Sequence, residues 1–155
     1  MSTPAVELPE GSTHVPHDEK HLTFVIGEES YALHISCVTE IIEMQTVTAM
    51  PNTPVHVRGI INLRGKVIPV VDVRISLGFP ERPYDSRTCI IVVHEESPVG
   101  LVVDTVREVV DIPSEVVREA PGVGEQALAD FVVGIAKTPE STHILLDSRR
   151  LLGDV

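Results

Sequence analysis

The chain has 155 residues, 43% of them apolar, which is enough for one globular domain with a buried core. Its formal net charge of −11 repels phosphate backbones and anionic lipid surfaces, so we expect no nucleic-acid partner. Aromatic residues make up only 3% of the chain, which leaves few side chains to stack on bases or sugars. Neither a secretion signal nor an apolar run approaching the roughly 20 residues of a membrane helix is found, so we expect a cytoplasmic protein.

Cys37 and Cys89 are the two cysteines of the chain, and they form neither a C-x-x-C motif nor a disulfide framework. Each lies in an apolar segment, where burial raises the pKa of a thiol instead of activating it. We therefore expect two core cysteines in a reducing compartment.

Residues 1–20 are predicted to form a disordered leader, because they are polar, are interrupted by proline and glycine, and show no apolar periodicity. His14, His17 and His21 have a spacing that could bind a metal on a helix. Fixing three ligands in such a leader costs chain entropy, so we interpret them as part of a solvated tail and expect no metal site.

From His21 onward, short apolar segments separated by polar, glycine or proline breaks predict β-strands. The many β-branched residues favour strands over helices. The predicted strands are Leu22–Ile26, Tyr31–Ile35, Val57–Leu63, Val67–Val71, Thr88–Val93, Val99–Val103, Phe131–Lys137 and Thr142–Leu146.

Two local signals refine this pattern. Arg64-Gly65 separates two predicted strands, and Gly65 can adopt the positive φ that a tight hairpin requires. Pro69 removes a backbone donor, so its strand is expected at a sheet edge or with a bulge.

Two short helices are also predicted. Cys37, Val38, Ile41 and Ile42 recur at one-turn spacing after Ser36, a possible N-cap. Asp72 is expected to cap a second helix over Val73–Leu77, ended by Gly78 and Pro80.

An internal repeat gives the strongest sign of domain organisation. Residues 28–30 (Glu-Glu-Ser) recur at 95–97, and Val38–Ile42 recurs as Val106–Val110. Three later matches keep this order: Gly59-Ile60 with Gly134-Ile135, Asp72 with Asp147, and Arg74 with Arg149. Each half is near the lower size limit for an independent core. We therefore expect one domain over residues 21–152, followed by a tail at 153–155. Its two β-subdomains, at about 21–85 and 86–150, would pack together, and exchange of strands between them is left open.

Motifs for catalysis or cofactor binding are missing from the sequence. It has no G-x-S-x-G elbow, and the fragment Gly122-Val123-Gly124 lacks the Lys-Ser/Thr ending of a phosphate loop. We expect a protein that is not an enzyme and has no cofactor. Glu40, within an apolar segment, and Arg64, at the hairpin apex, are either an ion pair or two unrelated surface charges, because pattern alone does not separate these alternatives.

Eighteen consecutive residues, Val57–Arg74, closely resemble the central signature of the CheW-like family. Val38-Thr39-Glu40-Ile41 resembles the earlier V-x-E-I segment of that family, and Val99–Asp104 resembles its later V-G-x-x-V-D segment. The resemblance spans about residues 21–152. It implies a mainly β fold, with two intertwined five-stranded SH3-like β-barrel subdomains and short helices.

The resemblance also implies a function. A free-standing member of the family is a non-catalytic adaptor that couples the cytoplasmic tip of methyl-accepting chemoreceptors to the regulatory domain of the histidine kinase CheA, in arrays at the membrane. Positions matching those where family coupling is sensitive to change are Val38, Glu40, Gly59, Arg64, Gly100 and Val106. Cys89 occupies a further such position but differs in residue type, so it is left out.

Two alternatives remain at this point. An equivalent coupling protein of a pilus-motility or other chemosensory-like pathway would carry the same signature. A small-ligand-binding β-barrel belongs to a different class, and a deep enclosed pocket with converging polar groups would distinguish it.

Overall fold

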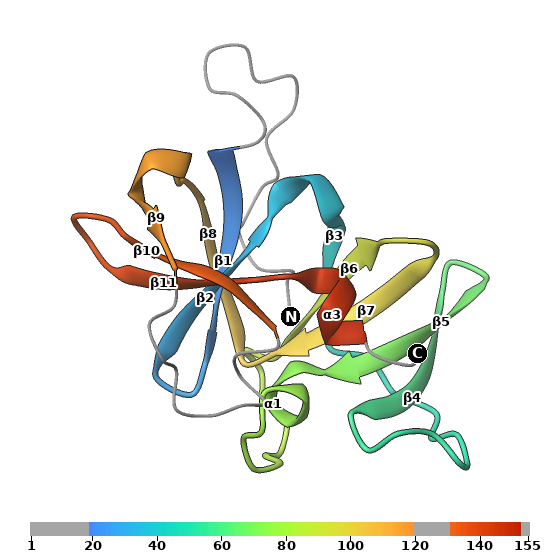
Figure 1. Ribbon diagram of the computed structural model, residues 1–155. Coiled ribbons are helices and arrows are strands. Elements are labelled where there is room, and N and C mark those ends of the chain that lie inside the picture. The colour runs from blue at the N-terminus through green and yellow to red at the C-terminus, as the bar shows by residue number, and fades with distance from the viewer. Residues whose placement is uncertain (1–18, 120–130, 153–155) are drawn as a thin grey trace.

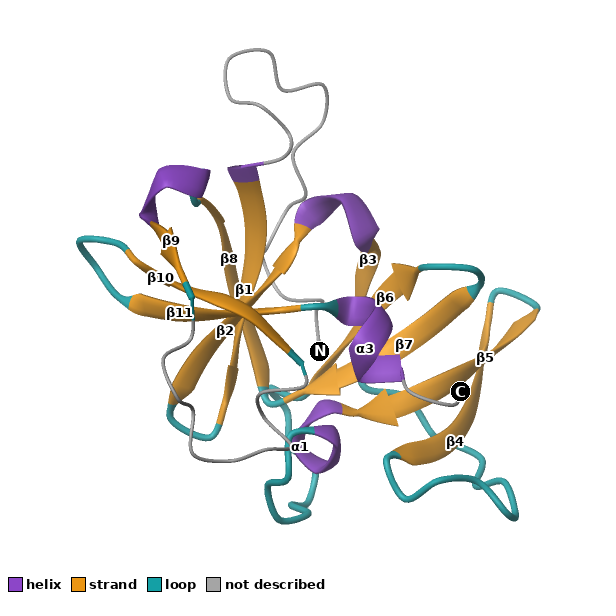
Figure 2. Ribbon diagram, in the orientation of Figure 1, coloured by secondary structure: helices purple, strands orange, loops and turns teal. Residues whose placement is uncertain are grey.

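The structure, a computed structural model, describes residues 19–119 and 131–152, which form two β-sheets and a few short helices (Figures 1 and 2). The first sheet contains β1 (Lys20–Ile26), β2 (Glu29–His34), β8 (Thr105–Asp111), β9 (Val117–Arg118), β10 (Val132–Lys137) and β11 (Thr142–Leu146). The second sheet contains β3 (Val38–Glu43), β4 (Val57–Leu63), β5 (Lys66–Asp72), β6 (Cys89–His94) and β7 (Pro98–Val103). The mainly β fold class and the eight predicted strands are confirmed.

Each sheet takes strands from both halves of the chain. In Figure 1 the blue β1 and β2 lie among the orange and red strands, while cyan, green and yellow strands form the other sheet. The first sheet has the order β8-β1-β2-β11-β10-β9 and the second has the order β3-β6-β7-β5-β4. Without the short β9, replacing each strand by its repeat counterpart converts one order into the other. The repeat inferred from the sequence is therefore a structural repeat with reciprocal exchange of strands.

This exchange decides how the chain divides. The first sheet is built from residues 20–34 and 105–146, and the second from residues 38–103. The expected boundary between 85 and 86 falls in the connection between the repeats, inside the span of the second sheet. The expected leader is outside the described residues up to residue 18, as are the tail at 153–155, Gly122-Val123-Gly124 and two of the three leader histidines. The interpretation of His21 as part of a solvated tail is wrong, because this residue is buried in β1.

The predicted helix at residues 37–42 is wrong, because Val38–Glu43 forms the strand β3. Its pairing with β6 shifts register between Val38 and Glu40. A bulge adds one residue and resets the two-residue alternation of a strand, so apolar side chains recur at a spacing that imitates a helix turn. Only residues 35–37 are helical here, as a single 3-10 turn.

Pro69 lies in an internal strand, so of its two expected settings the sheet edge is wrong, whereas the β4–β5 ladder does contain a bulge, between Val57 and Gly59 of β4. The strand β5 lies between β7 and β4. Its parallel pairing with β7, however, covers only Val70 to Asp72. Pro69 is tolerated because the missing donor falls in the part of β5 that has no partner on the β7 side.

Two other local predictions are confirmed. Arg64 and Gly65 form a two-residue hairpin turn with φ values of 51° and 88°, and Asn62 Oδ1 accepts a hydrogen bond of 2.9 Å from Gly65 N. Asp72 caps α1 (Val73–Ser76) by accepting a hydrogen bond of 3.0 Å from Arg74 N. At the repeat-equivalent position, α3 (Ser148–Leu152) follows β11.

Asp104 lies where the chain passes from β7 of the second sheet to β8 of the first. Its Oδ2 accepts hydrogen bonds from Gly27 N at 2.8 Å, Arg74 Nη1 at 2.6 Å and Arg82 Nη1 at 3.2 Å. These donors come from the β1–β2 turn, α1 and the connection between the repeats. Because the Asp104 side chain is only 17% exposed, its charge requires such partners. Asp104 thus binds three other segments to the point where the chain passes from one sheet to the other.

The buried imidazole of His21 makes the stability of the fold depend on pH. Burial is the main cause that lowers the pKa of His21 from 6.5. The hydrogen bond to Glu19 O raises this pKa in part, and the nearby His34 and His143 lower it further. The folded state therefore prefers the neutral ring, so this contribution is complete above pH 6.5 and is lost as the pH falls through the lowered pKa. We expect His21→Gln to reduce the loss of unfolding free energy between pH 7.5 and pH 5.5 in urea titrations. The exposed His94→Gln is the control, and an equal pH dependence in both variants would contradict the assignment.

Candidate partner-binding site

The ion pair between Glu40 and Arg64 joins two parts of the second sheet that are distant in sequence. Glu40 lies on β3 after the bulge, and Arg64 lies at the tip of the β4–β5 hairpin. Arg64 Nη2 donates to Glu40 Oε2, and this hydrogen bond, followed by the charge of Glu40, raises the pKa of Arg64. β3 and β4 are the two edges of the sheet, and the backbone bridge between Thr48 and Ile60 is a further link between them. Of the two alternatives for Glu40 and Arg64, the ion pair is the correct one.

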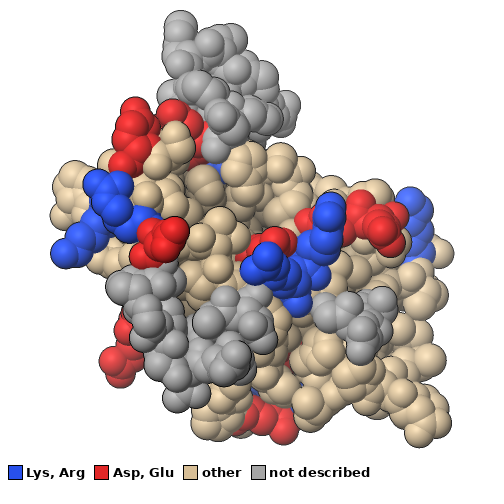
Figure 3. Space-filling model, in the orientation of Figure 1, with Lys and Arg blue, Asp and Glu red and all other residues tan. Residues whose placement is uncertain are grey.

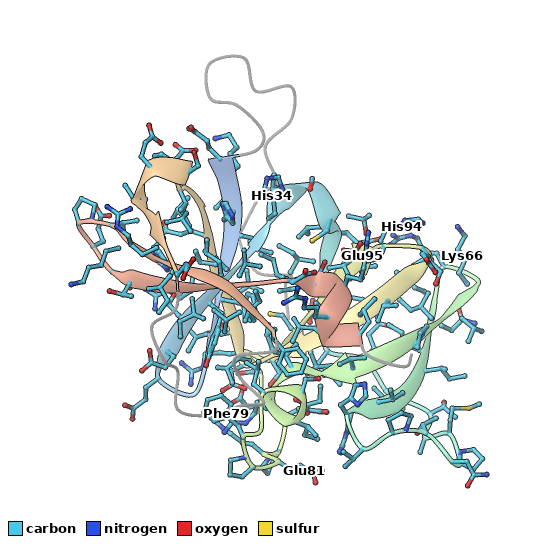
Figure 4. The ribbon with its side chains drawn as sticks, viewed as in Figure 1. His34, Lys66, Phe79, Glu81, His94 and Glu95 are labelled. Atoms are coloured by element: carbon cyan, nitrogen blue, oxygen red, sulfur yellow. The ribbon has the colours of Figure 1, made fainter. Side chains whose placement is uncertain are left out.

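Beside this pair, one end of the second sheet has a hollow of about 390 Å³. The floor is apolar, because Ile68 and Val92 are each only 2% exposed. The rim carries both signs of charge from Glu40, Arg64 and Lys66. The full lining is Thr39, Glu40, Leu63, Arg64, Lys66, Ile68, Val92, His94 and Pro98. His94 and Lys66 lie on the side of the second sheet farthest from the first sheet (Figure 4).

The hollow exists because β5 and β7 separate at this end. Their parallel pairing begins at Val70 and Gly100, so Ile68 and Pro98 lie beyond it and pair only with β4 and β6, on the other side of their strands. Both residues line the opening with apolar side chains. An apolar floor surrounded by charges suits a small anchored contact with another protein.

Gly59 and Gly100 lie beneath this site and do not line it. A Cβ on Gly59, whose φ is +148°, would lie 2.1 Å from Thr48 O, so the glycine allows the chain after β3 to cross the backbone of β4. A Cβ on Gly100 would lie 2.8 Å from Ile90 Cγ2 in the core of the second sheet. Both glycines therefore position the elements that carry Glu40 and Arg64.

Val38 and Val106 are repeat-equivalent residues next to the bulges of β3 and β8. Each is 8% exposed and belongs to the core cluster shared by the two sheets. Val106 lies on the first sheet, away from the Glu40–Arg64 pair. Of the six expected site residues, the structure thus brings two into direct contact, places three more in the packing of the same sheet, and places Val106 in the other sheet.

Sequence reasoning missed several residues of the hollow, namely Leu63, Lys66, Ile68, His94 and Pro98. Leu63 and Ile68 lie in predicted strands, and Lys66, His94 and Pro98 lie next to predicted strands, but nothing in the local pattern indicates that they converge. Arg64-Gly65 was the available signal, because the residues flanking a tight turn lie at one end of a hairpin.

Three groups whose pKa values are raised by burial belong to the packing of the fold. Burial raises the pKa of the thiols of Cys37 and Cys89, as the sequence predicted. It also raises the pKa of Asp72, whose carboxylate accepts a hydrogen bond of 2.9 Å from Tyr84 Oη. Within residues 19–119 and 131–152, no group of three or more histidine, cysteine, aspartate or glutamate residues could hold a metal.

Comparison with known proteins identifies the family. The family model described as the CheW-like domain matches residues 20–155. The chemotaxis protein CheW of Klebsiella aerogenes is 33% identical over 135 residues, which cover 86% of this chain and 81% of that protein. The crystal structure of the scaffolding protein TtCheW from Thermoanaerobacter tengcongensis has a TM-score of 0.77 at 37% identity and covers 84% of this chain and 89% of its own.

The chain belongs to the CheW-like family, and it is a homologue of chemotaxis scaffold proteins. A weaker similarity, of 27% over 113 residues, links it to Protein PilI of Pseudomonas aeruginosa and covers 72% of this chain and 64% of that protein. Among the described residues, no helix is long and apolar enough to cross a membrane.

Substitution of Gly59 tests its proposed positioning role. We expect Gly59→Ala to lower the free energy of unfolding by about 3 kcal/mol, because a clash with backbone atoms adds to the strain of a positive φ. Gly27→Ala is the matched control, since Gly27 also has a positive φ but a Cβ there would meet no atom within 4 Å. That control should cost only about 1 kcal/mol. Equal losses in urea denaturation would show that the close approach to Thr48 is unimportant.

Proposed function

We propose that this protein is a non-catalytic adaptor that couples methyl-accepting chemoreceptors to the histidine kinase CheA in bacterial chemotaxis. Membership of the CheW-like family carries the proposal. Its proposed partners are the cytoplasmic tip of the receptors and the regulatory domain of the kinase, which would recruit the protein to arrays at the membrane.

The surface chemistry supports a binding role. Burial raises the pKa of the Cys37 and Cys89 thiols and of the Asp72 carboxyl, which suits residues of the packed interior and not activated catalytic groups. On the face drawn in Figure 3, basic and acidic side chains lie next to each other between broad neutral areas. Interspersed charges around apolar contacts favour specific docking of a protein partner over non-specific attraction.

The second sheet is proposed to contact a partner protein through the hollow beside Glu40 and Arg64. Arg64 is 69% exposed on its side chain and keeps free donors for a partner, while Glu40 fixes the direction of the guanidinium. Val38, Gly59 and Gly100 would act by positioning this pair, and Val106 by holding β8 on the other sheet. This assignment explains how buried residues far from solvent could affect coupling.

A second candidate is an equivalent coupling protein of a pilus-motility or other chemosensory-like pathway. The similarity to Protein PilI favours it, but that similarity has lower identity and covers less of the relative than the similarity to the chemotaxis proteins does. Reconstitution with kinases of the two kinds of pathway separates these candidates, since only the cognate kinase should respond to receptor in the presence of the adaptor.

Arg64→Ala tests the site within this function. We expect about tenfold weaker coupling in a reconstituted receptor–kinase assay, because truncating an anchoring arginine removes several charge-assisted hydrogen bonds. The circular dichroism spectrum should remain unchanged, since the ion pair is exposed and adds little to stability. Arg87→Ala, which removes an exposed arginine from the connection between the repeats, is the control. Normal coupling by Arg64→Ala would remove this residue from the site.

A further inference from the structure

The repeat places a second hollow, of about 620 Å³, at the corresponding end of the first sheet. Glu108 follows the bulge of β8 as Glu40 follows that of β3, and its backbone N and O both bond to Thr23 Oγ1. The turn Pro139-Glu140 takes the place of Arg64-Gly65, because Thr138 and Ser141 pair across it. The two hollows are therefore related by the same repeat as the strands.

The floor of the second hollow is polar where that of the first is apolar. By register, Thr23, Ser30 and His143 take the places of Val92, Pro98 and Ile68. His143 is 7% exposed, and its Nδ1 bonds to Ser30 Oγ at 2.7 Å. No residue in the described part of the chain forms a hydrogen bond with Nε2, although His143 lines the hollow. A buried side chain thus presents an unused polar atom to the opening.

The charges at this hollow differ from those at the first in one decisive position. Glu40 has Arg64 as its partner, but the residue equivalent to Arg64 is Pro139, which carries no charge. Among the described residues, none forms an ion pair with the Glu108 carboxylate. The equivalent of Gly65 is Glu140, which adds a second negative charge near His143. At the two turn positions, a neutral proline thus replaces the arginine and an anion replaces the glycine.

Other charged groups line the same opening. Lys20 is paired with Asp111 at 3.1 Å, whereas Arg107 and Lys137 carry positive charge at the rim. Burial lowers the pKa of His143, Glu108 acts in the opposite direction, and Arg107 adds to the lowering. The imidazole is consequently neutral at pH 7. In the tautomer whose Nδ1–H donates to Ser30 Oγ, its Nε2 is an acceptor.

We propose that the second hollow binds an arginine side chain of a protein partner, in the place beside Glu108 that Arg64 takes beside Glu40. The guanidinium donates to the Glu108 carboxylate and to His143 Nε2, and its planar fork matches this pair of acceptors better than an ammonium does. The inference that the arginine belongs to a protein partner rests on the proposed function. The inference that the hollow binds a guanidinium rests only on the residues that line it.

The isolated full-length chain tests the site with N-acetylarginine amide as the probe. We expect saturable shifts of the backbone amide signals of residues 106–109, 138 and 140–143 in NMR titrations up to about 50 mM, the range for a single small group. Uncharged N-acetylcitrulline amide should leave them unchanged. Binding should be at least about threefold weaker in Glu108→Gln, which removes the charge at the same size.

Pro139→Arg places an arginine of the chain itself beside Glu108. This arginine should compete with the probe, so the probe should also bind more weakly to this variant. Glu96→Gln, in the exposed turn between β6 and β7, is the matched control and should bind like the native chain. Equal shifts with citrulline amide, no shifts at all, full binding in Glu108→Gln, or preference for N-acetylaspartate amide would each overturn the proposal. A failure here leaves the kinase reconstitution unaffected, so the two proposals are tested separately.

Discussion

Four strand pairings join one repeat to the other, and two of them, β1 with β8 and β3 with β6, are antiparallel while the other two are parallel. β2 pairs with β11 and β5 pairs with β7, so neither sheet is complete without strands from both halves of the chain. A two-stranded hairpin such as β1–β2 is marginal on its own, and it becomes stable only when the distant strands extend the sheet. The ionic contacts of Asp104 secure the point where the chain crosses between the sheets. The packing of either barrel therefore depends on residues of the whole chain.

The same pairings explain why one architecture has produced two different openings. In the second sheet the parallel pairing begins at Val70, which leaves Ile68 and Pro98 to form an apolar floor. In the first sheet it already includes His143 and Ser30, whose side chains also bond to each other. Small changes at equivalent positions thus alter surface chemistry without changing the order of the strands. A duplicated fold can in this way present one contact with an internal ion pair and another with an unpaired carboxylate.

Local features of this fold could be predicted from sequence, whereas features set by distant pairing could not. The Arg64-Gly65 turn and the Asp72 cap depend on residues adjacent in the chain, and both are present. The strand β3 was mistaken for a helix because its bulge disturbs the alternation of side chains. The ion pair of Glu40 with Arg64 remained one of two alternatives because it depends on how β3 and the hairpin meet in space. The hollow could not be predicted, since it depends on where β5 leaves β7.

The interlaced strands also constrain the order in which the protein can form during synthesis. Ser30 and His143 are 113 positions apart, yet their strands are neighbours in the first sheet. The β1–β2 hairpin leaves the ribosome long before β11 does and must wait, with its β2 edge unpaired, until β11 has been translated. Pairing over such separations is slow because a long loop must close first. A nascent chain of this kind exposes the unpaired edge of an incomplete sheet until its last strand is made.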